Sequence, residues 1–196
     1  MAENPLNLFL SASVPIAERA DGKYLATADV IAIRDAVIAL TSVALPYYRL
    51  IWGGHPSITP LITNVLKHSN KEVNANVTVY QSKYFVKIFP EENKYVEHIV
   101  VTDDLGELGK SLELMRSEMI VKNDFAAAVF IGGMNGVEDE YNMFVASHSD
   151  AKVLPVASTG AAALALYESQ KDQFDERLKT DLAYASLFKD LLMPQG

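Results

Sequence analysis

The 196-residue chain contains no cysteine, which excludes disulfides, thiolate metal ligands and a thiol nucleophile. It has four histidines, and they lie far apart in the sequence: His55, His68, His98 and His148. Metal sites usually take ligands at short, regular spacings, so this scatter argues against zinc. We therefore expect no bound metal.

Basic residues are scarce relative to acidic ones. The chain has 17 Lys and Arg against 25 Asp and Glu, for a formal net charge of −8. Proteins that hold a nucleic-acid backbone usually present a basic face. We therefore expect no nucleic-acid partner, although backbone N–H groups remain able to bind a small anion.

Long hydrophobic runs are also missing. No segment approaches the ~20 apolar residues that a membrane span requires. The N-terminal segment has no basic region and carries the acidic Glu3, unlike a signal peptide. We expect a cytoplasmic protein with no membrane partner. Without repeats or a Pro/Gly/Ser-rich linker, residues 1–196 are interpreted as a single domain.

The chain does contain short apolar runs that alternate with stretches of helical periodicity. Strands are predicted at 6–13, 48–52, 77–80, 99–101, 126–131 and 153–156. Helices are predicted at 29–45, 58–68, 107–122, 138–148 and 160–193, with a break near 175–180 and a short helix plus loop at 83–95. Pro155 favours an edge position for the last strand. This alternation predicts an α/β, Rossmann-like fold: an open, mostly parallel sheet with helices on both faces.

Three glycine-bearing turns each follow a predicted strand and precede a helix. Unpaired N–H groups at a helix start carry partial positive charge and attract phosphate. Ligands of open α/β sheets bind beyond the carboxyl ends of the strands, where these turns fall. The predicted ligand-binding residues are Ser11 and Ser13 after the first strand, then Gly53, Gly54, His55, Ser57, Thr59, Gly132, Gly133, Asn135, Gly136, Ser158, Thr159 and Gly160.

Each turn also has a purely structural interpretation. Ser57 and Thr59 are suited to capping a helix, and small residues near Gly160 permit close packing. The second turn reads G-G-x-x-G, whereas the dinucleotide fingerprint is G-x-G-x-x-G. A nicotinamide cofactor is therefore not predicted, and we expect no resident cofactor.

Arg116 and Glu140 are charged residues beside the apolar stripes of their predicted helices. A charge on an inward face is costly unless it is paired. The pair therefore forms either a structural salt bridge or part of a site. In a site, Arg116 would bind phosphate and Glu140 would act as a base or stabilise positive charge.

The segment Ile131-Gly132-Gly133-Met134-Asn135-Gly136-Val137-Glu138-Asp139-Glu140 resembles the P-G-G-x-G-T-x-x-E signature of the lysine-decarboxylase-like (LOG) proteins. In that family an arginine in an M-H-x-R-K helix precedes the signature, and Leu114-Met115-Arg116 is similarly placed. Isoleucine and valine replace the signature's proline and threonine, one residue is inserted before Gly136, and Ser117 replaces the lysine. The first turn looks more like the wider SLOG superfamily, which includes LOG, Smf/DprA and the nucleotide-sensing domains of TRPM channels.

The resemblance implies a small-molecule nucleotide as ligand and a nucleoside-phosphate N-glycosidase (phosphoribohydrolase) as the enzymatic form, with Arg116 and Glu140 as catalytic residues. A non-catalytic sensor that acts through assembly or a partner protein, or a scaffold with vestigial turns, are the alternatives. The resemblance also implies a homodimer. The apolar C-terminal stretch, which includes Leu178, Leu182, Phe188 and Leu192, could pack on the core or on a second chain.

Overall fold

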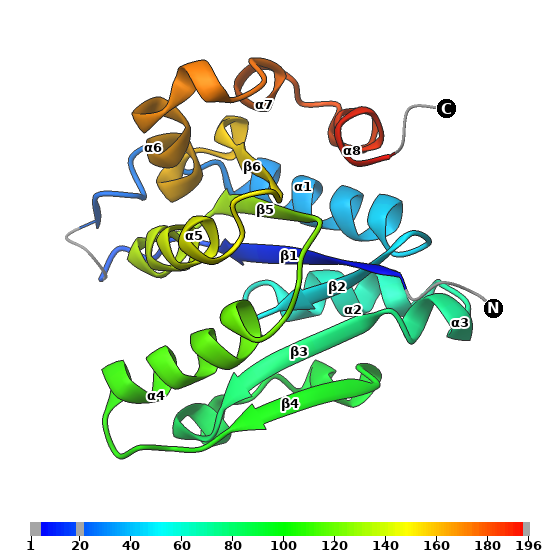
Figure 1. Ribbon diagram of the computed structural model, residues 1–196, viewed down its shortest axis with the longest axis vertical. Helices are drawn as coiled ribbons and strands as arrows, with labels where there is room; N and C mark the ends of the chain where they lie inside the picture. The colour runs from blue at the N-terminus through cyan, green and yellow to red at the C-terminus, as the bar shows by residue number, and fades with distance from the viewer. Residues whose placement is uncertain (1–4, 19–21, 194–196) are drawn as a thin grey trace.

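Six parallel strands form one sheet in the order β4-β3-β2-β1-β5-β6, as the computed structural model shows (Figure 1). It describes residues 5–18 and 22–193, so Glu3 lies outside the described residues. The strands are β1 (Leu6–Ser13), β2 (Tyr48–Trp52), β3 (Val77–Ser82), β4 (His98–Thr102), β5 (Ala127–Gly132) and β6 (Lys152–Val156). The predicted parallel α/β fold is confirmed, and Pro155 lies on an edge strand as expected.

Helices cover both faces of the sheet (Figure 1). On one face lie α1 (Val30–Ala44), α2 (Thr59–Lys67) and α8 (Tyr184–Leu192). On the other face lie α4 (Leu108–Arg116), α5 (Asn135–Ser147) and α6 (Ala161–Ser169). The described residues also form the short helices α3 (Lys71–Asn74) and α7 (Arg177–Thr180), with 3-10 turns η2 (Lys83–Ile88), η3 (Glu91–Tyr95), η5 (Ala157–Thr159) and η6 (Lys171–Gln173).

Successive side chains of each strand point to opposite faces of the sheet, and this alternation produces the two layers of the core. In β1, Leu8 and Leu10 pack toward α1 while Phe9 between them packs toward α5. Phe9 stacks on Phe144 of α5 with ring centroids 5.6 Å apart. Burying one such side chain contributes roughly 1.5–3 kcal/mol, so the alternating pattern holds both helical layers to the sheet.

Three predicted helices differ from those observed. The helix predicted at 138–148 is α5, which begins earlier, at Asn135, so that Gly136 lies in its first turn. The helix predicted at 107–122 is α4 followed by a π-helical turn, η4 (Ser117–Val121). The break predicted near 175–180 is confirmed in part: residues 174–176 and 181–183 are irregular, and α7 occupies 177–180 between them.

The apolar C-terminal stretch packs on this chain's own core. Leu178, Leu187, Phe188 and Leu192 are buried with residues of α1 and the strands. Leu182 is the exception and is exposed. Within the described residues, no helix is long and apolar enough to cross a membrane.

Candidate functional site

A cavity of about 600 Å³ opens at the carboxyl ends of the central strands. The chain moves outward in one direction from β1 to β4 and in the other from β5 to β6, so the order of strands reverses beside β1. Such a reversal creates the crevice in which open α/β sheets bind ligands. Eight of the residues predicted from sequence line the cavity: Ser13, Gly53, Gly54, His55, Arg116, Asn135, Gly136 and Glu140.

Glu140 lies at the inner side of this cavity with both carboxylate oxygens engaged. Ser11 Oγ donates to Glu140 Oε2 at 2.6 Å, and Arg116 Nε donates to Oε1 at 3.3 Å. Ser11, which does not line the cavity, therefore holds a residue that does. Burial raises the pKa of the Glu140 carboxyl, and the opposing effects of Arg116 and Ser11 only partly offset that cost.

Arg116 bridges α4 to the start of α5. Besides Glu140, Nη1 donates to Asp139 Oδ2 at 3.2 Å and Nη2 to the carbonyl of Gly136 at 3.4 Å. A guanidinium carries five N–H groups, so these contacts do not exhaust its donors. The sequence offered a structural salt bridge and a site as alternatives, and the geometry shows an ion pair that faces a cavity.

The π-helical turn η4 begins immediately after Arg116. A π turn widens the helix locally and is often found at functional sites. Here it ends the α-helical run at the arginine, while Met119 and Ile120 of the turn are buried. Sequence periodicity could not predict it, because a one-residue change of register leaves the apolar pattern nearly unchanged.

In the second glycine turn, the glycines permit a backbone conformation with positive φ, and the start of the following helix faces the cavity. Gly132 and Gly133 adopt φ of 56° and 89°, and a Cβ on Gly133 would lie 2.2 Å from Val137. Their N–H groups bond internally, to Thr159 Oγ1 at 2.9 Å and to the carbonyl of Ser13 at 2.8 Å.

The N–H groups of Asn135 and Gly136 follow, at the first turn of α5. Among the described residues, no side chain caps this helix start. Both residues line the cavity. The helix start can therefore offer N–H donors and partial positive charge to an anion in the cavity.

The first glycine turn is braced by its own side chains. Ser57 Oγ accepts from the N–H of Val14 at 3.2 Å and lies 2.8 Å from His55 Nδ1, so it joins the loop after β1 to the turn. Thr59 is buried and accepts from Trp52 Nε1 at 3.3 Å. Ser57 and Thr59 thus lie behind the cavity surface that Gly53, Gly54 and His55 form.

The third turn, with Ser158, Thr159 and Gly160, lies outside the cavity. Thr159 Oγ1 donates to the carbonyl of Val156 at 2.6 Å, besides accepting from Gly132. Ser158 Oγ lies 3.1 Å from the hydroxyl of Tyr184. At Gly160 a Cβ would lie 1.8 Å from the carbonyl oxygen of Thr27, so the chain itself covers this helix start.

One wall of the cavity is apolar and was missed in the sequence. It is formed by Phe85, Ile88, Phe89, Leu112 and Met115, from η2, the residue after it, and α4. Gln81 and Ser82 also line the cavity, at the carboxyl end of β3. The strand-end rule that identified Ser13 would have identified these two residues, whereas the apolar wall resembles ordinary core in the sequence.

Metal ligands do not gather in the described part of the chain, where no group of three or more His, Asp or Glu side chains could hold an ion. The chemistry of the site therefore resides in one carboxyl, one guanidinium, hydroxyls and backbone N–H groups beside an apolar wall.

These features define a Rossmann-like protein with an anion-suited cavity at its strand ends. The model of the SLOG cluster3 family matches residues 23–192. The chain belongs to the SLOG cluster3 family.

A solved structure described as the X-ray structure of TM1055, a structural genomics target, has a similar fold. The TM-score is 0.63 at 14% identity, and the match covers 95% of this chain and 99% of that chain. At this identity the likeness shows the fold alone. No curated protein sequence matches the chain significantly.

Proposed function

We propose that the cavity binds a nucleotide or a nucleotide-derived signal. The observation that carries this proposal is the meeting of an uncapped helix start and an arginine with an apolar wall, in one cavity at the strand ends. A nucleotide has a matching division, with an anionic phosphate at one end and a flat base with apolar faces at the other. The cavity volume lies within the range of small-molecule sites. Membership of the SLOG cluster3 family supports a nucleotide-related function.

In the proposed complex, the phosphate lies against the N–H groups of Asn135 and Gly136 and the guanidinium of Arg116. The base packs on Phe85, Phe89 or Leu112 across the cavity. The ribose then lies between these two ends, near Glu140. Arg116 is suited to phosphate because its planar group can donate two hydrogen bonds at once.

The enzymatic form of this proposal is hydrolysis of the N-glycosidic bond. The C1′–N bond breaks, and the base leaves with the electron pair and takes up a proton. Ionised Glu140 stabilises the positive charge that develops on the ribose. Water then adds its oxygen to C1′ and loses a proton, which yields free base and the ribose phosphate.

A non-catalytic sensor is the second candidate, and the state of Glu140 favours it. Its carboxylate already contacts Ser11 and Arg116, so both of its oxygens are engaged before any ligand arrives. A phosphate that draws Arg116 away from Glu140 would change the contacts between α4 and α5. That change is a route from binding to assembly or to a partner protein.

Calorimetric titration with nucleoside monophosphates, NAD and ADP-ribose tests binding, with the corresponding nucleosides as controls. We expect at least one phosphate-bearing ligand to bind and its nucleoside to bind more weakly. If no member of the panel binds, or if phosphate makes no difference, the phosphate site is wrong.

Chromatography of the same mixtures for free base separates the two candidates. Base released by the wild type and not by Glu140→Gln supports hydrolysis. Binding without any release of base from any ligand excludes the enzymatic form on this panel and leaves the sensor.

A further inference from the structure

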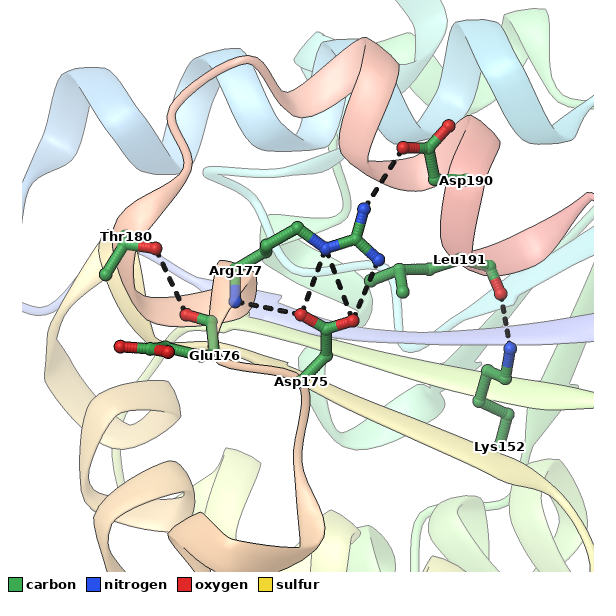
Figure 2. A network of polar contacts seen from close by, with 7 residues as sticks. All are labelled: Lys152, Asp175, Glu176, Arg177, Thr180, Asp190 and Leu191. Atoms are coloured by element: carbon green, nitrogen blue, oxygen red, sulfur yellow. Dashed lines mark hydrogen bonds and ion pairs between the residues drawn. The ribbon is translucent and has the colours of Figure 1, made fainter.

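The two edges of the sheet are protected to different degrees. At one edge, β6 carries Pro155, which lacks a backbone donor, and Lys152, whose Nζ donates to the carbonyl of Leu191 at 2.6 Å (Figure 2). Prolines, lysines and covering elements are the usual protection of a sheet edge against pairing with another chain.

A network of ion pairs also holds the two C-terminal helices beside the β6 edge. Arg177 of α7 pairs with Asp175 at 2.8 Å and with Asp190 of α8 at 3.1 Å, so it ties the two C-terminal helices together near β6 (Figure 2). The Arg177 guanidinium holds the pKa of the Asp175 carboxyl below its usual range. The edge at β6 is therefore closed by this chain.

The opposite edge, β4, has no such protection. It lies at the outer margin of the molecule and reads His98-Ile99-Val100-Val101-Thr102, without proline, lysine or acid (Figure 1). Ile99, Val100 and Val101 are 41%, 37% and 43% exposed. Three consecutive exposed β-branched residues leave both faces of this strand partly open, which is unusual for an edge strand in water.

The exposed surface continues along the chain beyond β4. Leu105 in the following loop and Leu108 at the start of α4 are 50% and 45% exposed. We call Ile99, Val100, Val101, Leu105 and Leu108 the β4 patch. Together they expose roughly 400 Å², close to the apolar part of the ~800 Å² that each partner buries in a standard interface. The patch is thus large enough for the core of one stable interface.

The β4 strand also suits pairing with itself. A two-fold axis can pair identical edge strands only in the antiparallel sense. With Val100 at the axis, residues 98–102 align with 102–98 of the second copy, and Ile99 lies beside the second copy's Val101. The central pairs, formed by residues 99–101, are then β-branched and uncharged, so no like charges oppose one another there. At either end, Glu97 faces Asp103 of the second copy, which places like charges at the margins of the pairing.

We propose that two copies of this chain pair antiparallel through β4, across a two-fold axis near Val100, and join their sheets into one. The inference is independent of what the cavity binds, because the β4 patch and the cavity share no residue.

Electrostatics add a dependence on salt. Each copy carries a formal net charge of −8, so the two copies repel one another over a long range. Salt screens that repulsion and leaves apolar contact intact. The proposed dimer should therefore strengthen as the salt concentration rises, whereas an assembly held by ion pairs would weaken.

The absence of cysteine allows a direct test. A cysteine introduced by Val100→Cys would be the only thiol in each chain, and the proposed axis places it opposite its copy at cross-strand distance. Ile31 on α1 is 64% exposed and remote from β4, so Ile31→Cys is the matched control. Under mild oxidation we expect Val100→Cys to form a disulfide-linked dimer at low protein concentration and Ile31→Cys to remain mostly unlinked.

Sedimentation velocity gives the second readout, on the wild type, Ile99→Lys and Ile31→Lys, with circular dichroism to verify folding. We expect the wild type and Ile31→Lys to be dimers at micromolar concentration, and the dissociation constant of Ile99→Lys to rise at least tenfold. A wild type that stays monomeric at high concentration and high salt overturns the proposal. So does an Ile99→Lys variant that dimerises as the wild type does.

Discussion

The second and third glycine turns look alike in sequence and differ in what covers them. Each follows a strand, carries glycine at positive φ, and precedes a helix: α5 after Gly133 and α6 after Gly160. The start of α5 opens on the cavity. The start of α6 is covered, because the N–H of Ala161 donates to Thr27 Oγ1 at 3.1 Å and Gly160 packs on the Thr27 carbonyl.

This difference shows that a helix start becomes an anion site only where the rest of the chain leaves space beside it. The dipole and the unpaired N–H groups are common to all helices. At the third turn a segment more than a hundred residues earlier in the chain supplies the partners. At the second turn, the N–H groups at the start of α5 face the cavity, where a ligand can supply the partners.

The largest expected effect is on stability, at Gly160. Gly160→Ala places a Cβ 1.8 Å from a backbone oxygen and puts an L-residue at φ 70°. We expect a loss of about 3 kcal/mol or more in the free energy of unfolding, measured by urea denaturation. Gly53→Ala is the control, because its Cβ would lie 3.6 Å from flexible methionine ends, and it should cost less than about 1 kcal/mol. Equal losses at the two positions would mean that the third turn is not the packed one.

The next effect is on ligand affinity. Arg116→Ala removes the guanidinium beside the start of α5, and we expect nucleotide affinity to fall by roughly 10- to 100-fold, by calorimetry. Ser158→Ala, in the third turn, should leave the affinity unchanged. If Ser158→Ala weakens binding as much as Arg116→Ala, the ligand contacts the third turn, and the assignment of the phosphate to the second turn alone is wrong.

Thr159 joins the two turns, and its removal should cost stability. Its Oγ1 accepts from the N–H of Gly132 and donates to the carbonyl of Val156, both buried. Thr159→Val keeps the shape and leaves both groups unpaired, for an expected loss of about 1–3 kcal/mol in the free energy of unfolding. A variant as stable as the wild type would show that the N–H of Gly132 and the carbonyl of Val156 find other hydrogen-bond partners.

The smallest effect is the pH dependence set by Glu140. Its folded-state pKa lies above its ordinary value of 4.5, so ionisation costs stability as pH rises through that raised pKa. Glu140→Gln cannot ionise. We therefore expect the Tm of the variant, relative to the wild type, to increase between pH 4 and pH 8 in calorimetric scans. A relative Tm that decreases over this range would show that ionised Glu140 stabilises the fold.

Much of the fold follows from sequence, because each strand is a short apolar run and each helix an apolar stripe. Ser13, Arg116 and Glu140 could be placed at the cavity by the same logic of strand ends and helix faces. The open second turn and the covered third turn could not be distinguished, since Thr27 covers Gly160 only after folding. The aromatic part of the apolar wall was missed because Phe85 lies in the 3-10 turn η2 and Phe89 directly after it, where helical or strand periodicity carries no information.

The backbone amides themselves give the most direct test of the central claim, which is that the second turn and not the third receives the phosphate. In ¹H–¹⁵N spectra recorded during titration with the nucleotide that calorimetry identifies, we predict the largest shifts at Asn135 and Gly136, with smaller ones at Gly53 and Gly54. The amides of Gly160 and Ala161 should move little. The largest shifts at Gly160 and Ala161, with Asn135 and Gly136 unmoved, would contradict the account.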